Sequence, residues 1–187
     1  MRDFRRQLLI GKMGESIIAL WLKSIGFHVL PVYEKETDDF KGPQFFCEGE
    51  ELVAPDMFVF NPSAPDGYFW HGWVEAKRKT RFSWYGIEKK FVTGINYNHY
   101  LDYLKVQKYS DHRVLLFFLH VQSDTWPRDV ERWKAPEECP TGLFYCAIDK
   151  PFLYKSADDD GVRMVYWQYG DLTQAASMEE LKPFLHK

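Results

Sequence analysis

Two acids and a lysine lie close together in a part of the sequence that is otherwise aromatic and aliphatic. Glu75 and Lys77 stand two residues apart near the end of GYFWHGWVEAK, and Asp56 begins the preceding stretch, DMFVF. Residues two apart in a strand project from the same face, so Glu75 and Lys77 are expected to point the same way. If the two stretches pair as an antiparallel hairpin, Asp56 comes within a few ångströms of Glu75.

Two carboxylates at such a separation need a cation between them, because their repulsion otherwise raises the pKa of at least one. Mg²⁺ is usually held by one or two carboxylates with water and phosphate oxygens, and the carbonyl of Ala76 could supply another ligand. Lys77 would then hold or help deprotonate the attacking water and offset charge on the phosphate. The set predicts metal-assisted hydrolysis. The alternative is an exposed strand face whose ion pair is worth well under about 1 kcal/mol.

A third acid, Glu15, lies on the apolar stripe of a predicted helix. It follows Leu8 by seven residues and precedes Ile18 by three. A carboxylate there is costly unless it is paired, hydrated or bound to metal. Gly11 and Gly14 cost about 1 kcal/mol each in a helix but permit close backbone approach. A binding role would justify them; the alternative places Glu15 at the edge of the stripe, reaching solvent.

The segment from Lys77 to Lys90 carries six basic residues against one acid, with aromatic residues interleaved. This combination suits phosphate contacts and stacking on unpaired bases or between base steps, so branched, flapped or single-stranded DNA would fit it. The alternative is a solvated basic loop whose aromatic residues only pack. The residues expected to contact nucleic acid are Lys12, Arg78, Lys79, Arg81, Trp84, Tyr85, Lys89 and Lys90.

The elements that must position these residues follow from periodicity and turn signals. Helices are predicted over about 4–25, 96–110 and 177–185, the last with a capping box from Ser177 to Glu180. Strands are predicted over 27–33, 56–60, 67–77, 113–121, 142–148 and 163–169, and a loop over about 36–52. The run over 113–121 is apolar throughout, as in a buried central strand. The order indicates an α/β or α+β domain with a mixed sheet.

Length and composition set the class of protein. The chain of 187 residues is expected to form one domain, and its 45% hydrophobic and 18% aromatic content argues against disorder. No apolar run approaches the roughly 20 residues of a membrane helix, and no signal-peptide core is present. Three cysteines without a CxxC pair indicate reduced thiols and no structural zinc. A soluble cytoplasmic protein is expected.

With these residues in hand, the sequence resembles the PD-(D/E)xK nuclease superfamily, and within it Holliday-junction-resolvase-like and related phage or bacterial nucleases. The matching motifs are Pro55–Asp56, Glu75–Ala76–Lys77 and the helix GKMGESIIALWLKSIGFHVL, and Gln107 matches more loosely a helix that often carries glutamine. The resemblance implies a restriction-endonuclease-like α-β-β-β-α-β core over about 4–122. It does not cover the C-terminal extension over about 123–187, which the strand pattern predicts to be rich in β-structure.

The resemblance also implies roles for these residues. Asp56, Glu75 and the Ala76 carbonyl would bind Mg²⁺ or Mn²⁺, Lys77 would act on the water, and Glu15 would assist. Gln107 could position water or a phosphate, or simply lie on the helix surface. The expected activity is metal-dependent hydrolysis of phosphodiester bonds in DNA.

Other interpretations stay open. Asp66, in a second Pro-Asp pair, could replace Asp56, although a strand holds a ligand more rigidly than a turn does. The chain could also be a catalytically silent module that binds nucleic acid or protein, or a nuclease acting on RNA. A homodimer would suit an enzyme that cuts both strands. The sequence leaves open whether the cut is sequence-specific, structure-specific or exonucleolytic, and what residues 123–187 do.

Overall fold

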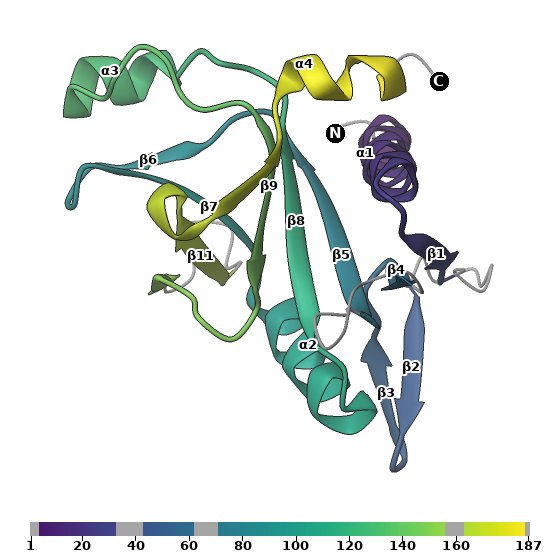
Figure 1. Ribbon diagram of the computed structural model, residues 1–187. Helices are drawn as coiled ribbons and strands as arrows, with labels where there is room; N and C mark the ends of the chain where they lie inside the picture. Colours follow the sequence, from purple (N-terminus) through teal and green to yellow (C-terminus); the bar gives the residue numbers. More distant parts are fainter. Residues whose placement is uncertain (1–3, 33–42, 62–70, 156–162, 186–187) are drawn as a thin grey trace.

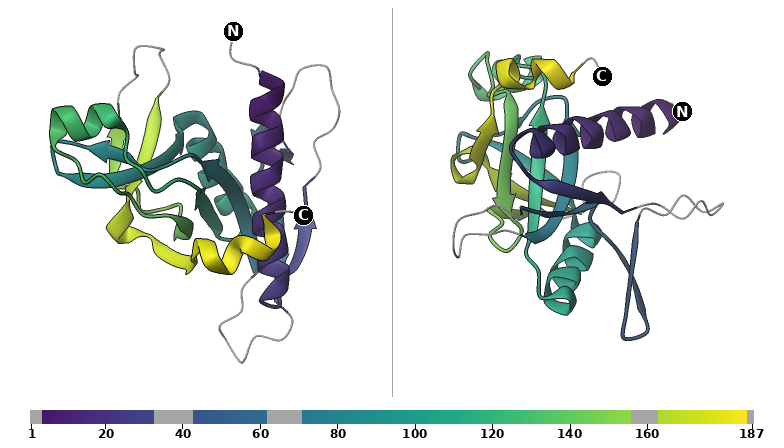
Figure 2. Two further views of the ribbon diagram at one scale, coloured as in Figure 1. Left: turned by 90° about the horizontal axis from the view of Figure 1, so that it is seen from above. Right: turned by 45° about the vertical axis from the view of Figure 1, so that its right-hand side comes forward.

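The computed structural model describes residues 4–32, 43–61, 71–155 and 163–185 (Figure 1). Within these ranges the chain forms a central six-stranded sheet, with α1 (Phe4–Ser24) on one face and α2 (Tyr97–Ser110) on the other (Figure 2). No helix in these ranges is both long enough and apolar enough to cross a membrane. The prediction of an α/β fold with a central mixed sheet flanked by helices is confirmed.

The central sheet is mixed in direction. Its strands lie in the order β1 (His28–Pro31), β4 (Met57–Phe60), β5 (His71–Lys79), β8 (Val114–His120), β9 (Gly142–Ala147) and β12 (Thr173–Ala176). β5 and β8 run parallel, and the other neighbouring pairs run antiparallel. From α1 to β8 the chain therefore passes through a helix, three strands of this sheet, a helix and a strand, as the sequence predicts.

Smaller elements surround this core. A second sheet contains β10 (Leu153–Lys155), β11 (Met164–Gln168), β7 (Lys90–Asn96) and β6 (Ser83–Tyr85), and β2 (Gln44–Cys47) pairs with β3 (Glu50–Val53). The remaining elements are α3 (Pro127–Trp133), α4 (Met178–Leu181), η1 (Tyr169–Asp171) and η2 (Lys182–Phe184). The capping box predicted at Ser177 and Glu180 is present at the start of α4.

β8 is the central strand because apolar groups cover both of its faces. Leu115 and Phe117 pack in a cluster with α1 and α4, whereas Leu116 and Phe118 pack with α2 and the second sheet. All seven of its residues are buried, as the continuous apolar run predicts. The same alternation on the neighbouring β5 turns Val74 towards α1, so its odd-numbered residues face α2.

Two sequence interpretations are wrong. Residues 44–53 are not a loop but the hairpin β2–β3, whose two-residue turn, Glu48–Gly49, has positive φ at both positions. Such turns match strand twist, but Glu48 gave no signal for one. The basic segment is also not one solvated loop, because β5 continues to Lys79 and β6 follows it. α3, β10 and β12 were not predicted, and Asp66 lies outside the described residues.

Candidate active site

The start of β4 and the middle of β5 bring Asp56 and Glu75 together. Phe58 and Trp73 are partners in the antiparallel ladder, and their rings meet with centroids 5.1 Å apart. When this antiparallel register is continued by two residues, Asp56, just before β4, lies opposite Glu75 of β5. Asp56 Oδ2 accepts a hydrogen bond of 2.8 Å from the Ala76 N–H, which fixes its carboxylate against β5.

Glu75 points into the interior on the α2 side. It is 1% exposed, and its Oε1 contacts the ammonium of Lys77, which is about one third exposed. Tyr103 of α2 is buried beside this pair, and His99 lies one turn earlier, with its ring centroid 5.9 Å from that of Tyr103. Neither residue belongs to a motif in the sequence. Spacing is the signal that could have found them, because His99, Tyr103 and Gln107 recur at four-residue steps on one helix face.

The charges of the cluster perturb one another. Burial raises the pKa of Asp56 well above its usual value, and Glu75 and Glu15 raise it further, against the lowering effect of Lys77. Burial lowers the pKa of Lys77, but the charges of Glu75 and Asp56 outweigh burial and raise it overall. Lys77 is therefore a cation at neutral pH, and three acids, one on α1, one just before β4 and one on β5, lie within electrostatic reach of it.

The α2 side responds to the same charges. Burial raises the pKa of Tyr103 well above its usual value, and Glu75 and Asp56 raise it further. Burial and then Lys77 lower the pKa of His99. A neutral tyrosine and a neutral histidine therefore adjoin the Glu75–Lys77 pair.

The donor set suits a hard divalent cation. The buried oxygens of Glu75 contact the Lys77 ammonium and lie near the Tyr103 hydroxyl, which leaves lone pairs free to bind a metal ion. The Ala76 carbonyl points to the same edge of β5 as the N–H that Asp56 accepts, as backbone groups of one strand residue do. Two carboxylates with a carbonyl are a sufficient protein contribution for Mg²⁺, which keeps several waters. In the described residues, no three or more His, Cys, Asp or Glu side chains form a ready metal-binding group.

Close packing of α1 on β5 brings Glu15 to the cluster. Gly14 is buried, and a Cβ there would lie 2.5 Å from Arg78 Cβ, so only glycine allows this approach. The predicted close backbone contact is thus present at Gly14. At Gly11 no atom lies within 4 Å of such a Cβ, so the expected close approach is wrong there.

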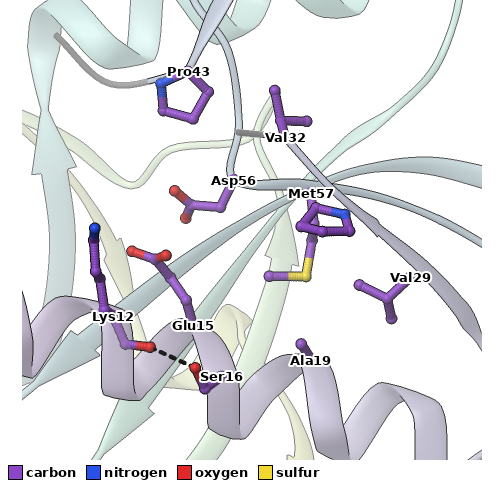
Figure 3. A pocket seen from close by; sticks show the side chains of 10 residues that line it. Lys12, Glu15, Ser16, Ala19, Val29, Val32, Pro43, Asp56 and Met57 are labelled. Carbon is purple, nitrogen blue, oxygen red and sulfur yellow. Dashed lines mark hydrogen bonds between the residues drawn. The ribbon is translucent and has the colours of Figure 1, made fainter. Parts of the chain in front are cut away.

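A cavity of about 420 Å³ opens between α1 and the edge of the sheet. Figure 3 shows Glu15 and Asp56 directing their carboxylates into the same part of it, with Lys12 beside them. Asp56 therefore belongs both to this cavity and to the cluster with Glu75.

Gln107 lies nearer the start of β8 than the charged cluster. Its Oε1 accepts a hydrogen bond of 2.9 Å from the Val114 N–H, where β8 begins. Val114 pairs with Trp73, whereas Lys77 lies four residues farther along β5. In this structure Gln107 serves the backbone that joins α2 to β8.

The residues expected to contact nucleic acid have different surroundings. Arg81 is 10% exposed on its side chain and is held by Asp124, Gln122 and the ring of Trp126, whose centroid is 4.4 Å away. Lys79 follows Lys77 on the same face, and burial together with Lys77 lowers its pKa to about 8.

The other members of the set are more peripheral. Arg78 packs on Gly14, while Lys12 is exposed at the cavity. Trp84 and Tyr85 are half-buried on β6. Lys89 is exposed in the β6–β7 turn, and Lys90 pairs with Glu88 at 3.2 Å. The structure thus gathers Lys12, Lys77 and Lys79 near the acids and disperses the rest.

The chain was compared with known proteins. No protein-family model matches the sequence, and no curated protein is detectably similar to it. Among solved structures, it is similar to Hjc, a Holliday junction resolvase from the archaeal hyperthermophile Archaeoglobus fulgidus. That alignment has a TM-score of 0.47 and 9% sequence identity, and it covers 86% of this chain and 89% of the other.

Proposed function

We propose that this chain is a metal-dependent nuclease that hydrolyses phosphodiester bonds in DNA. One observation carries the proposal: Asp56 is hydrogen-bonded to the backbone directly after Glu75, beside the buried Glu75–Lys77 pair and within electrostatic reach of Glu15. Burying Glu75 and holding two further acids half-buried beside it is costly for a protein, so a structural role alone does not explain them. Clusters of perturbed ionisable groups mark functional sites.

Asp56, Glu75 and the Ala76 carbonyl would hold Mg²⁺ or Mn²⁺. When bound, the ion would polarise the phosphoryl oxygen and lower the pKa of a water. Lys77, which is a cation, would stabilise negative charge that develops on the phosphate, a role its raised pKa favours over that of a base. Glu15 would orient water from the cavity side, and Lys79 would contact a neighbouring phosphate.

The test is cleavage of labelled DNA as plasmid, single strand, flapped duplex and four-way junction, with RNA of the same sequence in parallel. We expect cleavage with Mg²⁺ or Mn²⁺ and none in EDTA. Glu75→Gln and Lys77→Ala should each lower the rate by about 10²-fold or more, as loss of transition-state charge stabilisation does.

Lys105→Ala is the matched control. Lys105 lies exposed on α2 and also pairs with an acid, Glu50 at 2.9 Å, so its loss should leave the rate unchanged. Cleavage that survives in Lys77→Ala or Glu75→Gln would refute the assignment. Binding of DNA with no cleavage of any substrate would instead indicate a catalytically silent module, and cleavage of RNA alone would change the substrate class.

A further inference from the structure

Hydrolysis accounts for only one end of the cavity beside α1. Glu15 and Asp56 form its polar end, but the remaining wall is mostly apolar and includes Ala19, Val29 and Met57 (Figure 3). Phosphate, water and metal ions are polar or charged, so binding them does not explain an apolar wall. Its volume of about 420 Å³ lies within the range of roughly 300–1,000 Å³ that is usual for ligand pockets.

We infer that this cavity binds one unpaired nucleotide of the substrate, with the base and sugar against the apolar wall and a phosphate directed to Asp56 and Lys12. The inference rests on the proposed nuclease function and specifies its substrate. Continuity supports it, because Asp56 lines the cavity and also accepts the hydrogen bond from Ala76 in the catalytic cluster. A nucleotide in the cavity thus adjoins the phosphate to be cut.

Shape favours a nucleoside, and charge sets where its phosphate can lie. The cavity lining carries Lys12 together with two acids, Glu15 and Asp56, so a phosphate would be held on the Lys12 side, or through a Mg²⁺ ion bound by the acids, while the base occupied the apolar part. A base that is stacked and paired in a duplex is not free to enter a pocket, so enzymes that hold a base in one act on unpaired bases or extrude the base. The structure therefore points to preference for DNA ends, flaps or gaps over intact duplex.

Two serines on α1 provide a matched pair for the test. Ser16 lines the cavity and Ser24 does not, yet both are exposed and both bond to a carbonyl of their own helix, at 2.9 and 2.7 Å. Ser16→Trp should fill the cavity, and Ser24→Trp places the same side chain elsewhere on the helix. Ser16→Leu, a smaller block, serves if the tryptophan variant does not fold.

The direct readout is the methyl resonance of Met57 in protein labelled with ¹³C-methyl methionine, titrated in Mg²⁺ with thymidine monophosphate, which has no phosphodiester bond to cut, or with inorganic phosphate. We expect the nucleotide to shift Met57 but not the exposed Met13, and phosphate alone to leave Met57 unchanged. Ser16→Trp should weaken nucleotide binding by about tenfold or more, which is at least about 1.4 kcal/mol, whereas Ser24→Trp should not.

Cleavage gives the second readout. The wild type and Ser24→Trp should cut a flapped duplex faster than the same sequence fully paired, and Ser16→Trp should lose that preference. If the Met57 resonance does not shift with nucleotide, or if Ser16→Trp and Ser24→Trp bind nucleotide equally well, the inference is overturned even if the protein cuts DNA. A Met57 shift in a protein that cuts nothing supports the pocket and refutes the nuclease, so the two failures are distinct.

Discussion

Asp56→Asn should make the metal-free protein more stable while abolishing its activity. The asparagine oxygen can still accept the 2.8 Å hydrogen bond from the Ala76 N–H, but the negative charge beside Glu75 and Glu15 disappears. Removing one unfavourable charge commonly raises the free energy of unfolding by about 0.5–2 kcal/mol. For a chain of this length, about 1–2 kcal/mol corresponds to a rise in Tm of about 2–8 °C.

The pH dependence of this gain has a definite sign. Burial raises the pKa of Asp56 in the folded state above its unfolded value, and Glu75 adds to the effect. Below the unfolded pKa, about 3.9, both states are protonated and the aspartate costs nothing. As pH rises towards the folded pKa, only the unfolded state gains charge, so the wild type loses stability relative to Asp56→Asn. Above the folded pKa the difference is constant.

The assay is urea denaturation of both proteins in EDTA at several pH values between 4 and 8.5, repeated with Mg²⁺. The advantage of Asp56→Asn should be smallest near pH 4 and reach a plateau at higher pH. Saturating metal should stabilise only the wild type, by about 2.7 kcal/mol at 100 times Kd. A variant less stable than the wild type at pH 8, or an advantage that shrinks as pH rises, would refute this account of the Asp56 environment.

Three further perturbations test the surroundings of the site. Lys77→Met should lower the unfolding free energy by about 2–3 kcal/mol, because Glu75 is left buried without its cation. Adding Glu75→Gln to it should recover most of that loss, and denaturation of all three variants gives the coupling energy. Gly14→Ala should separate α1 from β5 and lower both stability and cleavage, whereas Gly11→Ala, with open space around it, should stabilise by about 0.5–1 kcal/mol. Equal effects of the two alanines in thermal denaturation would contradict the packing. Burial lowers the pKa of His120 to about 3, so stability should fall by about 1.4 kcal/mol per pH unit as pH drops below about 6.5. In urea denaturation, His120→Leu should reduce the dependence of the unfolding free energy on pH below about 6.5. An unchanged dependence would contradict the assignment of this effect to His120.

Period and alternation were sufficient to predict which residues at the centre of the candidate site lie close together. The two-residue repeat aligned Glu75 with Lys77, and pairing of two neighbouring strands along the chain brought Asp56 alongside. The stripe position of Glu15 was readable because a carboxylate among apolar helix residues is anomalous. These signals are local, or involve strands that are adjacent in sequence, and such patterns are the ones a single sequence retains.

The remaining features depend on contacts between distant segments. Arg81 lies in a basic segment rich in aromatic residues, which predicted a phosphate contact. In the structure it pairs instead with Asp124, which lies 43 residues later in the chain. Tyr103 reaches Glu75 only because α2 crosses the face of β5, a placement that no local pattern encodes. The hairpin β2–β3 was missed because its turn places Glu48 at positive φ, where glycine or asparagine is the usual signal.

The register of β4 on β5 couples folding to the chemistry of the site. A slip of one residue would turn Glu75 and Lys77 towards α1, into the cluster that contains Val74 and Ala76, and would turn those two apolar side chains towards α2 in their place. Burying the charged pair among aliphatic groups without Asp56 nearby would be more costly than any gain from alternative pairing. The apolar residues of β5 on the α1 side therefore hold Glu75 and Lys77 on the other face, so packing of the core favours the register that places Glu75 beside Asp56.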